Sequence, residues 1–325
     1  MRWDACNGDA DGLCALHQWR LARPAPDARL VTGPKRDIVL LDRIPAGEGD
    51  EVTVFDVSLA RNRIALEAML ARGARVRWFD HHRAGSAPLP EGLEATIDES
   101  PDTCTALLVD RAIGGTYRAW AAVGAFGDGL AAPALAIAAD LGLLAPQVAA
   151  LRELGEAINY NAYGDSDDDV LVPPREVYET LRGYPDPFAM LREQRLFRGL
   201  AAEQRADLDR ALAIGPSRPG ERAEIWRLPD APWARRVSGT LANRLASRQP
   251  DRAFAVVTPT QDGFKASVRV PRAHSWSASR FCGRYPAGGG RALAAGIDRI
   301  ARAELEAFCA DFAAIYATTQ PAVPT

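Results

Sequence analysis

The sequence has few cysteines, and they lack the spacing of a metal or disulfide framework. The five are odd in number, far apart and without a CxxC pair: Cys6, Cys14, Cys104, Cys282 and Cys309. This pattern argues against a cysteine zinc site and against disulfide bonds, and it suits reduced thiols in the cytosol. Histidine is also scarce, with four in 325 residues, so a pair of adjacent histidines is a strong signal.

Long apolar runs are missing too. Three aspartates interrupt the first 11 residues, where a signal peptide would need an apolar core, and the alanine-rich stretch 119–139 is broken by Asp128 and Pro133. We therefore expect a cytoplasmic protein without a membrane-spanning helix. The formal net charge of −3 argues against a general nucleic-acid coat, although it leaves room for a local basic patch.

Strand-like and helix-like segments alternate over the first half of the chain, which is the pattern of a parallel α/β sheet. The expected strands are 2–6, 28–32, 38–41, 51–57 and 75–79. A polar segment over 187–213 reads as a connecting helix. Beyond it we expect a strand at 222–228, a hairpin at 252–258 and 263–270, and a C-terminal helix over about 297–316. The sequence thus predicts an α/β protein of two lobes, with a larger domain at 1–185, a helical connector at 186–220 and a smaller α/β domain at 221–325.

Acidic or imidazole groups follow three of the expected strands. They are Asp9 and Asp11 after the first, Asp56 at the end of another, and Asp80, His81 and His82 at the end of a third. Carboxylates gathered in this way repel one another and are costly to bury unless a cation neutralises them. Oxygen ligands with an imidazole suit Mn²⁺ or Mg²⁺. With Asp128 as a further acid, there are enough ligands for two ions.

The spacing suggests which ligand serves which ion. Asp9 and Asp11, placed where the loop turns into a helix, can ligate neighbouring ions, and Asp56 is the natural bridge between them. His81 and Asp128 would complete the second site. Two divalent ions about 3.5–4 Å apart lower the pKa of a bridging water and hold a phosphate, which predicts hydrolysis of a phosphate ester without a covalent intermediate. Taken singly, the Asp-x-Asp-Gly motif is most often a turn and a His-His pair most often packing, but their conjunction favours a functional site.

The motifs resemble a known family. The segments Asn7 to Gly12, Phe55 to Ser58, Phe79 to His82 and Gly127 to Gly129 resemble, in order and spacing, the four motifs of DHH phosphoesterases. The stretch 288–296 resembles the glycine signature of the substrate-binding domain associated with them. The resemblance spans nearly the whole chain, and it implies Mn²⁺-dependent hydrolases such as RecJ-type exonucleases, nanoRNases and cyclic-dinucleotide phosphodiesterases.

Position by position, the resemblance implies roles for single residues. The implied metal ligands are Asp9, Asp11, Asp56, His81 and Asp128. Asp80 would orient His81 from behind, and His82 would face the scissile phosphate. The implied substrate-binding residues are His82, Ser267, Arg269, Gly288, Gly289, Gly290 and Arg291. Two positions depart from the family pattern: Asn7 stands where His or Asp is usual and should hold the first ion less tightly, and Arg291 replaces a His.

The second lobe carries a local excess of positive charge. Residues 263–297 contain six basic residues and no acidic one. Four aromatic residues are interleaved with them (Phe264, Trp276, Phe281 and Tyr285), a composition suited to phosphate contacts and base stacking. The alternative is that the aromatic residues belong to the core and that the arginines form a solvated face. Alternation along the strand places Ser267 and Arg269 on one side.

Together these features predict a hydrolase with its site in a cleft between the lobes, acting on phosphodiester bonds of short single-stranded oligonucleotides with two Mn²⁺ ions, or with Mg²⁺ instead. A first alternative is a small phosphorylated metabolite, a nucleoside bisphosphate or a cyclic dinucleotide as substrate. A second is a weakly active nucleotide-binding regulator, supported only by Asn7. No obligate protein partner or membrane contact is expected, and a homodimer stays open.

Overall fold

The computed structural model describes residues 1–164, 166–286 and 288–317, and it divides the chain into two compact units, Met1–Glu203 and Gln204–Thr325. The boundary lies within helix α9 (Leu196–Ile214), inside the predicted connector. That connector is not one helix, because α8 (Pro187–Glu193) ends before α9 begins. Within the described ranges, no helix combines the length and the apolar character that crossing a membrane requires.

The first unit is built on a five-stranded sheet in which every neighbouring pair is parallel, as the sequence predicts. The strand order is β2-β1-β3-β4-β5, with β1 at Arg2–Asn7, β2 at Arg29–Gly33, β3 at Glu51–Phe55, β4 at Arg75–Asp80 and β5 at Leu93–Ile97. The edge strand β5 was not predicted, because its side chains are all half-buried or exposed and its apolar pattern is weak.

Residues 38–41, predicted as a strand, do not form one. Leu40 and Leu41 are fully buried, but their backbone N–H groups donate to the Asn62 side chain, at 3.0 and 3.2 Å, instead of to a neighbouring strand. The chain then makes a short 3₁₀ turn, η1 (Leu41–Arg43). This short apolar run is therefore a buried loop segment whose backbone is hydrogen-bonded by the Asn62 side chain.

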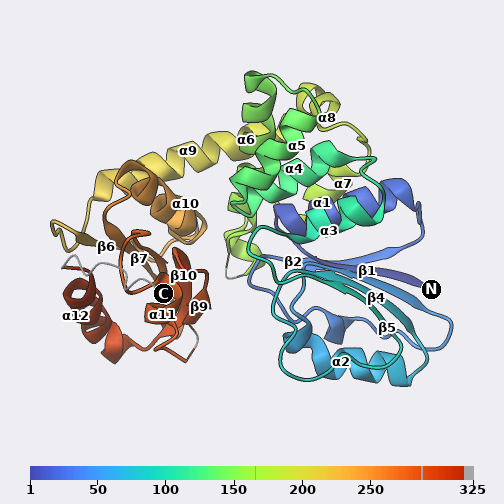
Figure 1. Ribbon diagram of the computed structural model, residues 1–325, viewed down its shortest axis with the longest axis horizontal. Coiled ribbons are helices and arrows are strands. Elements are labelled where there is room, and N and C mark those ends of the chain that lie inside the picture. The colour runs from blue at the N-terminus through green and yellow to red at the C-terminus, as the bar shows by residue number, and fades with distance from the viewer. Residues whose placement is uncertain (165, 287, 318–325) are drawn as a thin grey trace. The chain divides into compact units, whose positions relative to one another are not determined.

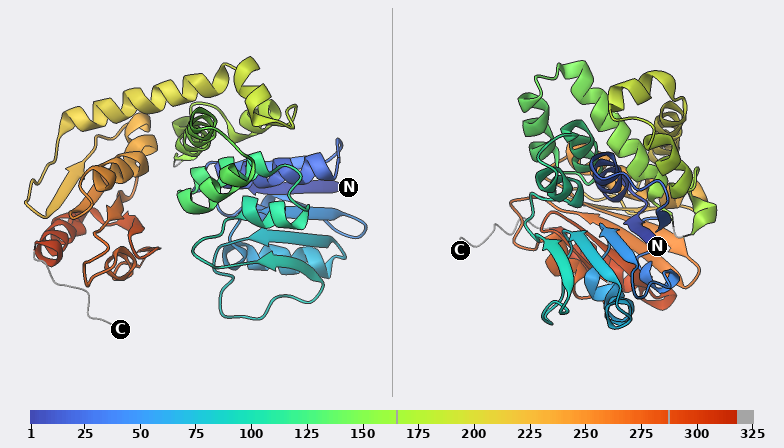
Figure 2. Two further views of the ribbon diagram at one scale, coloured as in Figure 1. Left: turned by 45° about the horizontal axis from the view of Figure 1, so that its top comes forward. Right: turned by 90° about the vertical axis from the view of Figure 1, so that its right-hand side faces the viewer.

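Helices cover both faces of this sheet (Figure 1 and Figure 2). On one face Cys6, Phe55 and Phe79 pack in a core with several helices: α1 (Ala10–Ala22), α3 (Thr105–Ala112), α4 (Arg118–Gly127), α5 (Ala131–Asp140), α6 (Ala145–Ala162), α7 (Pro174–Leu181), α8 and α9. On the other face Val54 and Trp78 pack with α2 (Leu59–Ala71). Successive strand residues point to opposite faces, so strands buried on both sides read as continuous apolar runs.

The second unit contains a mixed five-stranded sheet in the order β6-β7-β8-β10-β9. Its strands are β6 (Ala223–Arg227), β7 (Ala253–Thr260), β8 (Gly263–Arg269), β9 (Gly288–Gly290) and β10 (Ala294–Ile300), and only the β6–β7 pair is parallel. Ala255 and Val257 pack on one side with α11 (Ala278–Cys282) and α12 (Leu305–Tyr316). Phe254 and Val256 point the other way and are also buried, and α10 (Pro232–Arg248) packs against their strand.

The C-terminal helix begins later than predicted. Residues 297–300 belong to strand β10, where Ile297 pairs with Ala266 of β8 and with Gly288 of β9. The alanines that precede this segment favour a helix, but pairing with the neighbouring strands makes it a β-strand. A short 3₁₀ turn, η3 (Arg302–Glu304), separates the strand from α12.

Candidate metal centre

The predicted ligands gather at the carboxyl ends of three adjacent parallel strands. Asp9 follows β1, Asp56 follows β3, and Asp80 is the last residue of β4 with His81 and His82 directly after it. Since β1, β3 and β4 are neighbours and run the same way, their ends meet at one edge of the sheet. Asp9, Asp11, Asp56 and Asp80 are each at most 2% exposed.

Asp56, His81 and His82 form the tightest group. Each offers a ligand atom, and these atoms lie within 4.8 Å of one another, the one such group found among the described residues. The Asp56 Oδ1 atom is 3.4 Å from His81 Nε2 and 3.7 Å from His82 Nδ1. His81 Nε2 is also 3.8 Å from Asp11 Oδ2. A carboxylate with two imidazoles is a donor set that suits a divalent metal ion.

The backbone at Asp56 is held in an uncommon conformation. Its φ of 56° makes it the one non-glycine residue with positive φ in the part of the chain that the structure describes. Its N–H donates to the Phe79 carbonyl at 3.0 Å, which ties the end of β3 to β4. Aspartate tolerates this region better than most residues, and such conformations cluster at functional sites. The turn directs the Asp56 carboxylate toward the two histidines.

Asp80 contacts His82 rather than the ring of His81. Its Oδ1 atom lies 2.7 Å from His82 Nδ1 and accepts the backbone N–H of His81 at 2.9 Å. The expectation that Asp80 orients the His81 ring therefore does not match the contacts, because the chain turns directly after β4 and brings the second ring back. Asp80 Oδ2 is buried without a hydrogen-bond partner among the described residues. With Nδ1 engaged, His82 has Nε2 left for a ligand.

Asp9 and Asp11 are held by backbone groups at two helix starts. Asp9 is the N-cap of α1, and its Oδ1 accepts the Gly12 N–H at 3.1 Å. The two oxygens of Asp11 accept the N–H groups of Thr105 and Ala106, at 2.8 and 2.7 Å, and so cap the start of α3. Thr105 also places its hydroxyl 3.4 Å from Asp56 Oδ1. Protein hydrogen-bond donors therefore hold the carboxylates of Asp9, Asp11 and Asp56 in place.

Asn7 bonds the loop backbone. Its Oδ1 accepts the Asp9 N–H and its Nδ2 donates to the Lys35 carbonyl, each at 3.2 Å. Lys35 follows strand β2, which is next to β1, and its ammonium pairs with Asp9 Oδ2. Sequence reasoning missed this lysine. The available signal was its place just beyond a predicted strand, at the edge where the other candidates gather.

The electrostatics of the cluster indicate a shortage of positive charge. Burial, with repulsion from Asp9 and Asp11, raises the pKa of Asp56 well above its usual value. Burial lowers the pKa of His81, but the hydrogen bond and charge of Asp56 outweigh it and raise this pKa to about 10. Burial also acts to raise the pKa of Asp9, yet the Lys35 ammonium outweighs it and the pKa is lowered. Carboxylates in this state fit a site for a divalent cation.

Asp128 lies at the C-terminal end of α4 and is half-buried. Its negative charge raises the pKa values of Asp11 and His81, each as one of several causes after burial. It therefore lies near enough to act on the cluster, although it is not one of the three residues that converge most tightly.

Apart from His82, the predicted substrate-binding residues lie in the second unit. Ser267 and Arg269 are half-buried on the same side of β8, and Arg269 Nε donates to Asn243 Oδ1 at 2.7 Å. Gly289 and Arg291 are exposed. The glycines form strand β9 rather than a flexible turn, with Gly289 opposite Gly296 and Gly290 opposite Ala295.

The basic and aromatic stretch is less open than predicted. Phe281 is fully buried in an aromatic cluster with Phe308 and Phe312, so for this residue the core interpretation is confirmed. Lys265 is also buried, and Arg284 pairs with Asp311 at 2.8 Å. Base stacking on Phe281 is excluded. The arginines of this stretch other than Arg284 remain candidates for phosphate contact.

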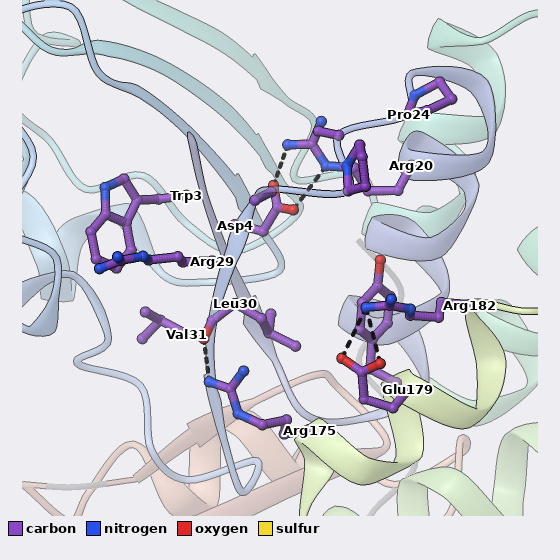
Figure 3. Close-up of a pocket in the computed structure, with 14 residues that line it drawn as sticks. Trp3, Asp4, Arg20, Pro24, Arg29, Leu30, Val31, Arg175, Glu179 and Arg182 are labelled. Carbon is purple, nitrogen blue, oxygen red and sulfur yellow. Dashed lines mark hydrogen bonds and ion pairs between the residues drawn. The ribbon is translucent and has the colours of Figure 1, made fainter. Parts of the chain in front are cut away.

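A cavity of about 750 Å³ lies away from the ligand cluster, beside the amino-terminal parts of β1 and β2 (Figure 3). Its charged groups largely satisfy one another: Arg20 pairs with Asp4 through two contacts, Arg182 pairs with Glu179, and Arg175 donates to the Leu30 carbonyl (Figure 3). A hollow whose charges are already paired is a weaker candidate for chemistry than the unbalanced cluster.

No protein-family model matches the chain, and no curated protein matches it significantly. Solved structures do match. A DHH-domain protein described as a member of a family of ribosomal proteins matches with a TM-score of 0.70 and 16% identity, over 98% of this chain and 87% of that one. The exonuclease RecJ bound to manganese matches with a TM-score of 0.62 and 21% identity, over 98% and 90%. The pGpG-specific phosphodiesterase PggH of Vibrio cholerae matches with a TM-score of 0.53 and 13% identity, over 97% and 100%. The chain therefore has the fold of the DHH-domain proteins over nearly its whole length.

Proposed function

We propose that this protein is a metal-dependent phosphoesterase that hydrolyses phosphodiester bonds in short single-stranded oligonucleotides. One observation carries the proposal: Asp56, His81 and His82 converge within 4.8 Å at the edge of the sheet where further buried carboxylates gather. The fold supports it, since two proteins that share this fold are described as an exonuclease and a phosphodiesterase. Mn²⁺ is the cation we propose, with Mg²⁺ as the alternative, because structures of RecJ are described with each.

The residues of the cluster would have different roles, some in holding the cation and one in contacting the phosphate. A divalent cation held there would polarise the phosphate and lower the pKa of a nearby water molecule. The buried Asp56 and the half-buried His81 would hold the cation, and Thr105 lies within reach of the Asp56 carboxylate. His82, whose side chain is 45% exposed and whose Nδ1 is fixed by Asp80, would present Nε2 to the phosphate.

Charge supports a short substrate. Removing the six positive charges of residues 263–297 from the total of −3 leaves −9 for the rest of the chain. A long strand would therefore find no continuous positive track outside this stretch, and such tracks are what binders of long single strands use. We expect activity to be highest on oligonucleotides of roughly two to five units, which match a few phosphate contacts and one or two stacked bases.

The test is turnover with Mn²⁺ against a panel of single-stranded RNA and DNA oligonucleotides from two to fifty units, cyclic dinucleotides, nucleoside bisphosphates and nucleoside monophosphates. The short-substrate proposal expects the highest kcat/KM on the shortest oligonucleotides. Equal efficiency on a two-mer and a fifty-mer would contradict it and favour a RecJ-like nuclease. Activity on monophosphates alone would favour a phosphatase of small metabolites, and tight nucleotide binding without turnover would favour a regulator.

The glycine strand gives matched variants for the substrate side. A Cβ added at Gly289 meets nothing within 4 Å, whereas one added at Gly288 would lie 1.9 Å from the Cys282 carbonyl oxygen. Gly289→Ala should therefore fold normally and report on phosphate approach, and Gly288→Ala serves as the variant whose effect is structural. A raised KM in Gly289→Ala and in Arg291→Ala, with unchanged melting temperature, is the expected result. An unchanged KM in both would remove this strand from the substrate site.

A further inference from the structure

Lysine is almost absent from this chain. Of its 39 lysines and arginines, only Lys35 and Lys265 are lysines. Lys265 is 3% exposed, and Lys35 lies against the carboxylates of the candidate metal centre. At this position the chain therefore presents a compact point charge rather than a wide, planar guanidinium.

The ammonium of Lys35 is held from several directions. It pairs with Asp9 Oδ2, lies 3.3 Å from Asn159 Oδ1, and faces the Tyr163 ring at 5.4 Å from its centroid. An ammonium has three N–H donors and is attracted to the face of an aromatic ring. Asn159 belongs to α6 and Tyr163 directly follows it, so the rigid end of a helix fixes the charge beside Asp9.

The backbone of Lys35 is fixed as well. Its N–H donates to the Ala162 carbonyl at 2.9 Å, and its own carbonyl accepts from Asn7 Nδ2 at 3.2 Å. A carboxylate at position 7 could not donate this hydrogen bond. Asn7 and Lys35 therefore work as a pair: the amide that departs from the family pattern positions the lysine that neutralises Asp9.

The other half of the centre differs. Asp56, His81 and His82 converge with their ligand atoms within 4.8 Å, and the ion pairs of Asp56 among the described residues are with these imidazoles rather than with a lysine or an arginine. A cation bound near Asp9 would meet the Lys35 ammonium, and like charges at contact distance repel strongly in a buried setting. A cation at Asp56 would not face that contact.

We propose that the Lys35 ammonium takes the place of one of the two cations that the sequence predicts, so that the centre holds a single divalent ion at Asp56 and His81, with His82 beside it. This inference rests on the proposed metal-dependent function and specifies its cation count. Asp9 then serves as the partner of Lys35 rather than as a ligand of a second ion.

The experiment measures metal stoichiometry rather than activity. The full-length protein, stripped with a chelator, is dialysed to equilibrium against Mn²⁺, and bound manganese is measured by elemental analysis and by electron paramagnetic resonance, which distinguishes an isolated ion from a coupled pair. Lys35→Met removes the charge at similar length. Arg36→Met removes one positive charge at the next position and is the matched control.

We expect one isolated ion per chain in the wild type and in Arg36→Met, and two coupled ions in Lys35→Met. Two ions in the wild type would overturn the inference while leaving the proposed function intact, and this result needs no variant to fold. A single ion in folded Lys35→Met would overturn it as well. No bound manganese in any form would instead contradict the proposed metal-dependent function.

Discussion

Buried carboxylates lie at both ends of strand β1, and their negative charge is neutralised in different ways. Toward the amino-terminal part of β1, the buried Asp4 carboxylate receives two contacts from the Arg20 guanidinium, one of them at 2.8 Å. At the carboxyl ends of the strands, Asp9 after β1 and Asp56 after β3 lie near each other, and the Lys35 ammonium pairs with Asp9. The first arrangement is balanced within the protein. The second is balanced in part by Lys35, and the raised pKa values of Asp56 and His81 show that these groups hold protons more tightly than usual.

The difference shows how to separate a structural ion pair from a functional site. Both regions contain buried charge and perturbed carboxyl groups, so burial alone does not distinguish them. The balanced pair is complete without a ligand, whereas the cluster gains most from one that brings positive charge. Variants at each end therefore test this contrast.

The largest effect is expected at Asp56. Asp56→Asn keeps the shape but removes the charge that both histidines face, so we expect activity to fall by more than about 100-fold, beyond the 10–100-fold typical of partners behind a ligand. Manganese content should fall with it, as measured by elemental analysis. Asp262→Asn, at an exposed position in the β7–β8 turn, is the control with the same loss of charge. Tight metal binding with more than a few per cent activity in Asp56→Asn would contradict the assignment.

Breaking the Asp4–Arg20 pair should instead lower the free energy of unfolding. Arg20→Met leaves Asp4 buried without its partner, which typically costs about 3–5 kcal/mol of unfolding free energy. Urea unfolding measures the loss. The double variant Asp4→Asn with Arg20→Met removes both charges and should recover most of it. Activity per folded molecule should stay unchanged in both variants, and a selective loss of activity would show that this end also takes part in function.

The sequence predicted the position of the site better than its contacts. The parallel sheet and the strand-end acids follow from apolar runs that end in Asp56 and Asp80, because such runs are local and strong. The partner of Asp80 did not follow, since it depends on how the backbone turns at His81 and His82. Lys35 was missed for a related reason: its place just beyond a predicted strand was visible, but its role depends on β2 lying beside β1.

The second unit was harder to predict because its pairing is less local. The segment 297–300 carries helix-like neighbours, yet it pairs with β8 and β9. Phe281 was expected to stack on bases, and it is instead part of a buried aromatic cluster whose other members come from α12. Alternating aromatic and basic residues cannot by themselves distinguish a stacking surface from a core with arginines around it.

A pH experiment separates the core of the first unit from the cluster. His17 is buried in α1, with Nε2 2.8 Å from the Tyr184 carbonyl, and burial lowers its pKa to about 4. The unfolded chain takes up a proton near pH 6.5 while the folded one does not, so stability is complete above pH 6.5 and falls as the pH drops toward 4. The loss reaches about 3 kcal/mol. His17→Gln should show a correspondingly smaller fall in denaturant unfolding over this range, and an equal fall would place the titration elsewhere.

The smallest effect is expected at Asn7, where the contacts reverse the simplest expectation from sequence. A carboxylate at position 7 would add charge near the first predicted ion, so the sequence predicts that Asn7→Asp tightens metal binding. In the structure the amide instead accepts from Asp9 and donates to the Lys35 carbonyl, and an aspartate would lose the second bond. We therefore expect Asn7→Asp to leave Mn²⁺ affinity within about threefold of the wild type and to cost about 1 kcal/mol of stability, the usual contribution of one hydrogen bond. Calorimetric titration with Mn²⁺, together with urea unfolding, measures both quantities. If Asn7→Asp tightened the Mn²⁺ affinity by tens-fold, the side chain at position 7 would be a ligand of an ion, and the proposed role of Lys35 would be contradicted.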